Sequence, residues 1–234
     1  TGSATLTWAL TEFNILTVNP PNFAGDARTN NPAGYGVSSF LNGQFFAEYY
    51  RVAMKYGVAF MNSWSILEGG GNSGAGDLGY LGGNNNAPVP RSSYYHMQMI
   101  ANYLLPGGYL PSSSSAPNLA VLSTSTQCQT RLAVMLLNEE TTESQAFTIR
   151  MNDEPVVGGG TKINVSAGLA KEYSGTLDNQ TTSVLIFDED GALKRRITYS
   201  LARYLANLPP LVETFTGNDT APATPAGLIV TSGD

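Results

Sequence analysis

The sequence predicts a two-part fold, in which an α/β part is followed by an all-β part, an antiparallel β-sandwich. Over residues 5–105, apolar strands alternate with segments of helical periodicity, the order typical of parallel βαβα units. Beyond residue 108, short segments of alternating hydrophobicity are separated by turns, which is typical of a sandwich. We therefore assign residues 1–108 to the α/β part and residues 109–213 to the sandwich.

The first predicted strand covers residues 5–13, TLTWALTEF, because β-branched and aromatic residues dominate it and no Gly or Pro interrupts it. With strict period two, Leu10 and Glu12 share one face and Phe13 lies on the other. A strand that is apolar on both faces is typical of a parallel sheet covered by helices. A long polar loop, 17–37, follows it.

The first predicted helix covers residues 38–56, where apolar residues recur every three or four positions. Ser38 or Ser39 is suited to the N-cap, and Gly57 to the end of the helix. The remaining elements of this part are a strand at 58–66, a Gly-rich loop at 69–83 and a helix at 91–105.

The sandwich is predicted from six short strands separated by turn residues. The strands are 118–124, 131–138, 144–151, 161–166, 182–188 and 193–198. FDEDGA, 187–192, is predicted to be a hairpin turn, because it lacks the ligand pattern of a calcium loop. Residues 214–234 are rich in Thr, Pro and Gly, and resemble a linker and the start of a fibronectin type III-like module.

Composition excludes several classes of partner. Charged residues make up 13% of the chain, about half the usual share, and the net charge is -6. Nucleic-acid binding is therefore not expected, because it needs a basic surface. A membrane partner is not expected either, since no apolar run approaches the roughly 20 residues of a span. With a single His, His96, no His-based metal site or Ser-His-Asp triad can be built, and we expect no cofactor.

Two parallel strands and two helices do not close a core, because their sheet edges stay exposed. We therefore predict that residues 1–105 are the last two βα units of a (β/α)8 barrel, incomplete in this chain. The earlier strands are expected on another chain or a removed segment. Active sites of such barrels lie at the C-terminal ends of the strands. Glu12 ends the first strand here, and Trp64 and Glu68 lie at or just past the end of the second.

The residues at these strand ends resemble a known family. Thr11-Glu12-Phe13-Asn14 is similar to the Thr-Glu-Trp-Asn signature at the seventh strand of clan A glycoside hydrolases, closest to the β-xylosidase-like family 39. Phe13 stands where the family usually has Trp. Further motifs follow in the family's order, over residues 5–105: FFAEYYRVAMKYG, NSWSILEGG, GDLGYL and VPRSSYYHMQMIANYL. The sandwich matches the clan in architecture only.

The resemblance implies a secreted retaining glycoside hydrolase that acts on plant or algal polysaccharide. It implies that Glu12 is the catalytic nucleophile and that Trp64 forms the floor of the sugar site. The acid/base of this clan lies on the fourth strand, so this chain alone is expected to be inactive. Asn14, Glu68 and Tyr35 are candidates for substrate contacts, and Asn30 and Asn31 lie in the same long loop as Tyr35.

Other interpretations remain open at this stage. Glu12 is also compatible with a solvent-exposed strand end, Trp64 with a core position, Glu68 with a plain loop acid and Asn14 with a turn. The alternative function is a non-catalytic carbohydrate-binding or structural β-sandwich module of a multidomain polysaccharide-degrading protein. The weakly charged, polar composition is common in secreted or cell-surface proteins, and the fibronectin-like tail favours a bacterial source.

Overall fold

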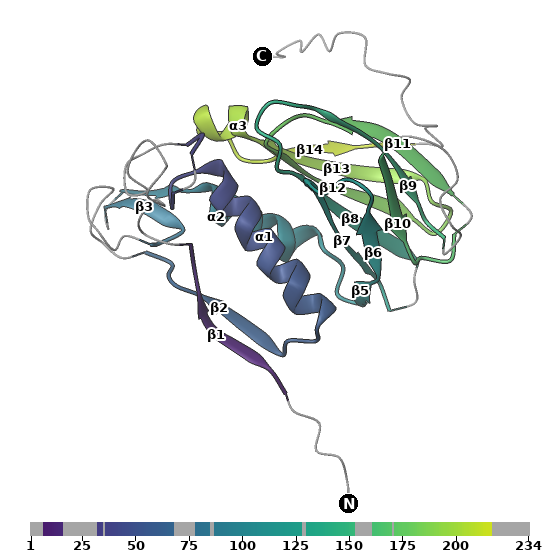
Figure 1. Ribbon diagram of the computed structural model, residues 1–234, viewed down its shortest axis with the longest axis horizontal. Helices are drawn as coiled ribbons and strands as arrows, with labels where there is room; N and C mark the ends of the chain where they lie inside the picture. Colours follow the sequence, from purple (N-terminus) through teal and green to yellow (C-terminus); the bar gives the residue numbers. More distant parts are fainter. Residues whose placement is uncertain are drawn as a thin grey trace, which may run out of the picture.

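A computed structural model of the chain describes residues 7–15, 32–34, 36–67, 78–84, 87–127, 130–152, 161–169 and 171–216. Helices and strands are mixed in this part of the chain, and strands predominate. The elements form successive layers: a small two-stranded sheet, a pair of helices, and two larger sheets that face each other (Figure 1).

The small sheet consists of β1 (Ala9–Phe13) and β2 (Phe60–Ser63), which pair in parallel, as the sequence predicted. Helix α1 (Phe40–Lys55) connects them and covers one face of the pair (Figure 1). Its start and end are those expected. The Oγ of Ser39 accepts a hydrogen bond from the Asn42 N–H at 3.1 Å, and Gly57 has a φ of +66° just past the end.

The predicted alternation within the first strand is wrong at one point. A register shift between Leu10 and Phe13 puts an extra residue into β1. Leu10 lines a groove together with side chains of α1, and the Phe13 ring stacks on Tyr49 of the same helix. Both residues therefore contact the helix side, although strict period two placed them on opposite faces.

A second helix follows a hairpin that the sequence did not predict. Strands β3 (Leu81–Asn84) and β4 (Ala87–Pro90) pair antiparallel. β3 overlaps the end of the expected Gly-rich loop, 69–83, and β4 lies between that loop and the expected helix at 91–105. Helix α2 (Ser92–Tyr103) then runs beside α1. His96 of α2 is fully buried, and its Nε2 lies 2.8 Å from the Thr182 Oγ1 of the adjoining sheet. This histidine therefore packs between α2 and the six-stranded sheet.

The larger of the two facing sheets has six strands in the order β14-β13-β12-β8-β7-β5, all antiparallel to their neighbours. A short helix, α3, links β13 to β14. The bounds are β5 (Gly108–Leu110), β7 (Leu119–Ser125), β8 (Arg131–Asn138), β12 (Thr181–Asp188), β13 (Leu193–Ser200), α3 (Leu201–Leu205) and β14 (Leu211–Thr214).

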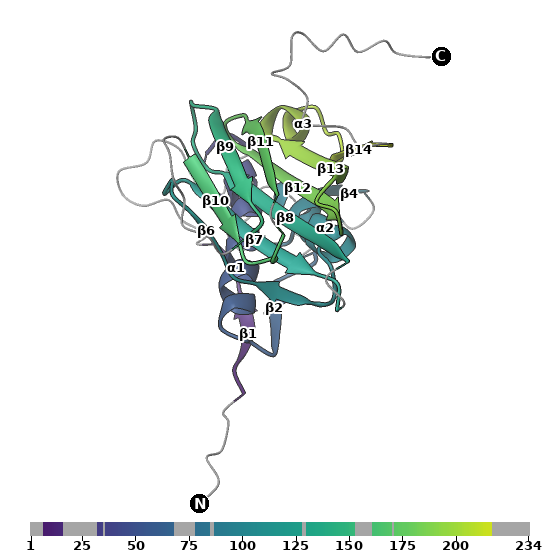
Figure 2. The same cartoon turned by 90° about the vertical axis from the view of Figure 1, so that its right-hand side faces the viewer.

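The smaller sheet has the order β11-β9-β10-β6, and Figure 2 turns it toward the viewer. Its bounds are β6 (Ser112–Ser114), β9 (Gln145–Arg150), β10 (Thr161–Val165) and β11 (Glu172–Leu177). Strands β9 and β10 pair in parallel, which corrects the expectation of purely antiparallel pairing. Parallel neighbours cannot be joined by a two-residue hairpin turn, and residues 151–160 separate these two strands in the sequence.

Two apolar cores hold these layers together, and strand β8 contributes to both. Its alternate residues Leu132, Val134 and Leu136 lie in the core between the two sheets. Met135, from the intervening set, lies in a second core between the six-stranded sheet and the helices, with Phe40 of α1. The helices are thus fixed on one side to the large sheet and on the other to the β1–β2 pair.

Candidate functional site

The C-terminal ends of β1 and β2 bring Asn14 and Trp64 together, as the prediction of parallel neighbours requires. The Asn14 Nδ2 donates to the backbone carbonyl of Trp64 and, at 2.7 Å, to that of Leu78. The Asn14 Oδ1 accepts from the N–H of Ile15 at 2.7 Å. The amide therefore ties the end of β1 to the end of β2 and to the segment that leads into β3. This is a positioning role, directed at backbone groups.

Glu12 is exposed at the C-terminal end of β1. The residue after it, Phe13, is buried and anchors this end of the strand. Its ring stacks on that of Tyr49 with a centroid distance of 4.8 Å, and it packs on Phe46 at 5.0 Å. Phe13, at the position where the resembled family usually has Trp, thus holds the backbone beside Glu12 against α1.

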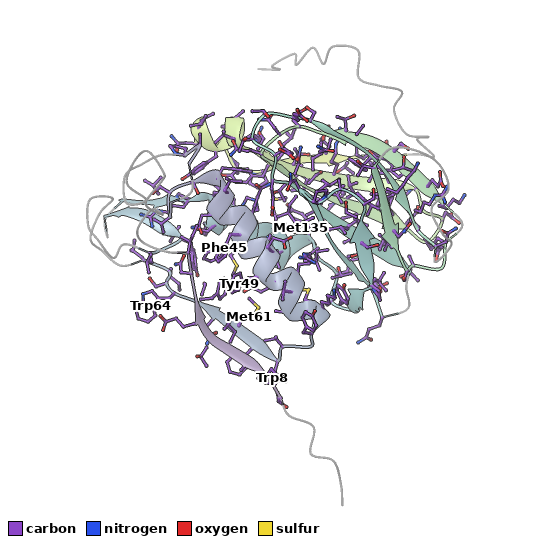
Figure 3. The ribbon with its side chains drawn as sticks, in the orientation of Figure 1. Trp8, Phe45, Tyr49, Met61, Trp64 and Met135 are labelled. Atoms are coloured by element: carbon purple, nitrogen blue, oxygen red, sulfur yellow. The ribbon has the colours of Figure 1, made fainter. Side chains whose placement is uncertain are left out.

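Trp64 follows directly on β2, and its N–H donates to the carbonyl of Phe13 at 3.0 Å. The Trp64–Ser65 peptide bond is cis. Trp64 is 49% exposed, so it is not a core tryptophan. Figure 3 shows Trp64 and Trp8 at opposite ends of the two-stranded sheet. Of these two tryptophans, only Trp64 lies at the strand ends where the site is expected.

The other predicted contact residues are not among those that the structure describes. Glu68 and Tyr35 lie outside the described residues, as do Asn30 and Asn31. Their proposed contacts with substrate stay predictions.

Two features near the site were missed by reasoning from the sequence. Arg91 is buried before α2, and its Nη1 donates to the carbonyl of Gly79, which supports the segment that Asn14 also holds. An apolar groove of about 660 Å³ lies between β1 and α1. Its signal was available in the exposed end of the apolar strand, at Trp8, and in the apolar face of the helix.

The described residues include neither a metal-binding cluster nor a membrane-spanning helix. The described part of the chain holds no group of three or more His, Cys, Asp or Glu side chains suited to a metal ion. Among the helices placed by the structure, none is long and apolar enough to cross a bilayer.

No family model and no curated protein matches this chain. Among solved structures, it is similar to the thermostable GH51 α-L-arabinofuranosidase from Thermotoga petrophila RKU-1, with a TM-score of 0.44 and 13% identity. The match covers 78% of this chain and 41% of that one, so this chain spans less than half of that enzyme's length. At this TM-score and identity, the likeness assigns no family to this chain.

Proposed function

We propose that this chain is the C-terminal portion of a secreted retaining glycoside hydrolase acting on plant or algal polysaccharide. The observation that supports the proposal most is the position of Glu12, Asn14 and Trp64. All three lie at the C-terminal edge of one parallel strand pair. This edge is where (β/α)8 enzymes gather their active-site residues.

In the proposed reaction, the Glu12 carboxylate attacks the anomeric carbon and forms a covalent glycosyl–enzyme bond. A second carboxyl group protonates the departing glycosidic oxygen, and then removes a proton from the water that hydrolyses the intermediate. The two carboxyl groups must be about 5–5.5 Å apart for this retaining route. We propose that the second group comes from the N-terminal remainder of the barrel, so this chain alone turns over no substrate.

The neighbouring side chains suit supporting roles in such a site. The half-exposed indole of Trp64 offers an apolar platform for the C–H face of a sugar ring. Asn14 holds the carbonyl of Trp64 and so fixes that platform relative to β1, which carries Glu12. Phe13 is stacked on α1, so the strand end has little freedom to move the carboxylate.

A non-catalytic carbohydrate-binding or structural role is the second candidate. It is favoured by the two facing sheets, which close around a core of their own and would persist without a barrel. Under this interpretation Glu12 has no role in turnover.

The decisive experiment is Glu12→Gln in the complete enzyme, in which this chain is joined to the rest of the barrel. The matched control is Glu189→Gln, which removes an exposed carboxylate from the turn between β12 and β13. We expect Glu12→Gln to lower kcat on the order of 10⁴-fold or more while the circular dichroism spectrum is unchanged. We expect Glu189→Gln to keep full turnover. Undiminished hydrolysis by Glu12→Gln would leave only the non-catalytic role.

A further inference from the structure

The groove between β1 and α1 is an apolar recess of about 660 Å³ at the surface of the described residues. Its walls include six large side chains, from the start of β1 and the outer face of α1 (Figure 3 labels Trp8, Phe45 and Tyr49). They are Trp8, Leu10, Phe45, Tyr49, Val52 and Tyr56. Trp8 is 66% exposed and Tyr56 is 68% exposed, so a large apolar area faces solvent when the chain stands alone.

The groove presents almost no charge to a partner. Its single acidic lining residue, Glu48, forms an ion pair with Arg51 of the same helix, with Oε2 and Nη2 2.7 Å apart. A partner that fills the groove therefore gains by burying apolar surface, and a highly charged partner would lose its hydration without compensation.

The groove runs along a sheet edge that lacks a neighbour. Within the described residues, β1 pairs with β2 alone, so one side of its backbone has no strand beside it. Parallel sheets occur almost only with further strands and with helices covering their faces. The groove also continues an interface that already exists, since α1 is packed on β1 through the stacked rings of Phe13 and Tyr49.

The right-handed connection of parallel strand–helix–strand units indicates which element packs beside α1 on the open side of the groove. Connections between parallel strands are right-handed in nearly all proteins. A strand that precedes β1 and pairs with its free edge must therefore place its connecting helix on the face that α1 covers. That helix lies next to α1 and fills the groove from the open side.

We propose that this groove is the docking surface for a preceding strand–helix unit, whose strand adds parallel to β1 and whose apolar helix packs on Phe45, Tyr49 and Val52. The inference rests on the proposed function, because it states where the N-terminal remainder of the barrel joins this chain. The occupant is therefore a polypeptide segment that supplies one strand and a helix with an apolar face.

Thiol labelling tests the proposal with a matched pair of valines. Val52 in the groove is 43% exposed, and Val212 on β14 is 45% exposed. Each is replaced by Cys in a Cys128→Ser background, and its reaction with a maleimide is timed in this chain alone and in the complete protein. We expect Val52→Cys and Val212→Cys to react at similar rates in the chain alone. In the complete protein, Val52→Cys should react at least 10-fold more slowly, and Val212→Cys at an unchanged rate.

Three outcomes would overturn the proposal. Equal labelling of Val52→Cys in both forms would show that the groove stays open. Protection in the chain alone, together with a dimer in analytical ultracentrifugation, would identify a second copy as the occupant. Protection in a monomeric chain alone, lost after extraction with organic solvent and refolding, would identify a small apolar ligand.

The result also separates this inference from the proposed activity. Protection of Val52→Cys in a complete protein that hydrolyses no glycoside would leave the docking surface standing and end the hydrolase proposal. Turnover that depends on Glu12, with Val52→Cys freely labelled, would do the reverse. As a second variant, Val52→Lys should weaken assembly of the complete protein at least 10-fold, whereas Val212→Lys should not.

Discussion

The two parts of this chain differ in how completely they bury their apolar side chains. In the two facing sheets, Phe187 and Leu136 are fully buried. In the α/β part, Trp8, Phe60 and Ile66 are each more than half exposed. The antiparallel sheets cover one another, whereas the parallel pair β1–β2 has a helix on one face and, within the part of the chain that the structure describes, no strand beside either outer edge. Parallel units therefore need further units, and antiparallel sheets of this size do not.

The boundary between the two parts is itself an apolar core, the one between the helices and the six-stranded sheet. Phe40 of α1 and Met99 of α2 meet Met135 and Tyr199 of the six-stranded sheet, and all four are fully buried. This packing holds the helices in place against the six-stranded sheet, and α1 in turn packs on β1, which carries Glu12.

The largest expected effect on stability comes from removing one phenylalanine ring from each part. Equal losses would contradict the difference in packing between the two parts. Phe187→Ala removes a ring from the core between the sheets and should lower the free energy of unfolding by about 3–5 kcal/mol. Phe60→Ala removes the same ring from β2, where Phe60 is 53% exposed, and should cost less than about 1 kcal/mol. Urea unfolding followed by circular dichroism measures both. Equal costs would mean that β2 is as well buried as the sheets.

A smaller effect is expected where the helices meet. A Cβ on Gly43 of α1 would overlap the His96 ring and the Ser92 hydroxyl of α2, lying 2.7 Å from His96 Cε1. Gly43→Ala should therefore destabilise the chain by about 1–3 kcal/mol, although Ala favours the helix by about 1 kcal/mol. The same urea titration measures it. In a His96→Ala background the loss should shrink, and an unchanged loss would show that the His96 ring is not the group that the new Cβ meets.

The smallest expected effect is a change in the free energy of unfolding with pH, caused by His96 and Glu139 at the same boundary. Burial lowers the pKa of His96 to about 4, and burial, with the charge of Glu48, raises the pKa of Glu139 to about 7. Between pH 4 and 6.5 the unfolded chain binds a proton at His96 that the folded chain does not, so this term makes stability rise with pH. Between pH 4.5 and 7 the folded chain keeps a proton on Glu139 that the unfolded chain has lost, so this term makes stability fall as pH rises.

Glu139→Gln separates the two terms, because it leaves the His96 term in place. The stability of this variant relative to the parent chain should increase as pH rises from 4.5 to 7, by less than about 1.4 kcal/mol per pH unit. Urea unfolding at several pH values gives the difference directly. A difference that does not change with pH would mean that Glu139 is fully hydrated in the folded chain.

Elements with local signals were predicted well from the sequence, and elements that depend on a neighbour were not. Strand β8 matches its predicted bounds, because a continuous apolar run identifies a strand wherever it pairs. By contrast, β6, Ser112–Ser114, lies outside the six strands that the sequence predicted for the sandwich. Its serines form a strand only because they pair with β10. The parallel pairing of β9 with β10 likewise has no local signal.

For the candidate site, the sequence by itself determined which residues lie at the C-terminal ends of the two strands: Glu12 and Asn14 at the end of the first, Trp64 at the end of the second. Only the tertiary structure decided that these ends lie side by side and that the Asn14 amide bonds to the carbonyls of Trp64 and Leu78. The physical reason is range. Periodicity, caps and breakers act between residues a few positions apart, whereas a backbone carbonyl or a sheet edge takes whichever partner the folded chain brings to it.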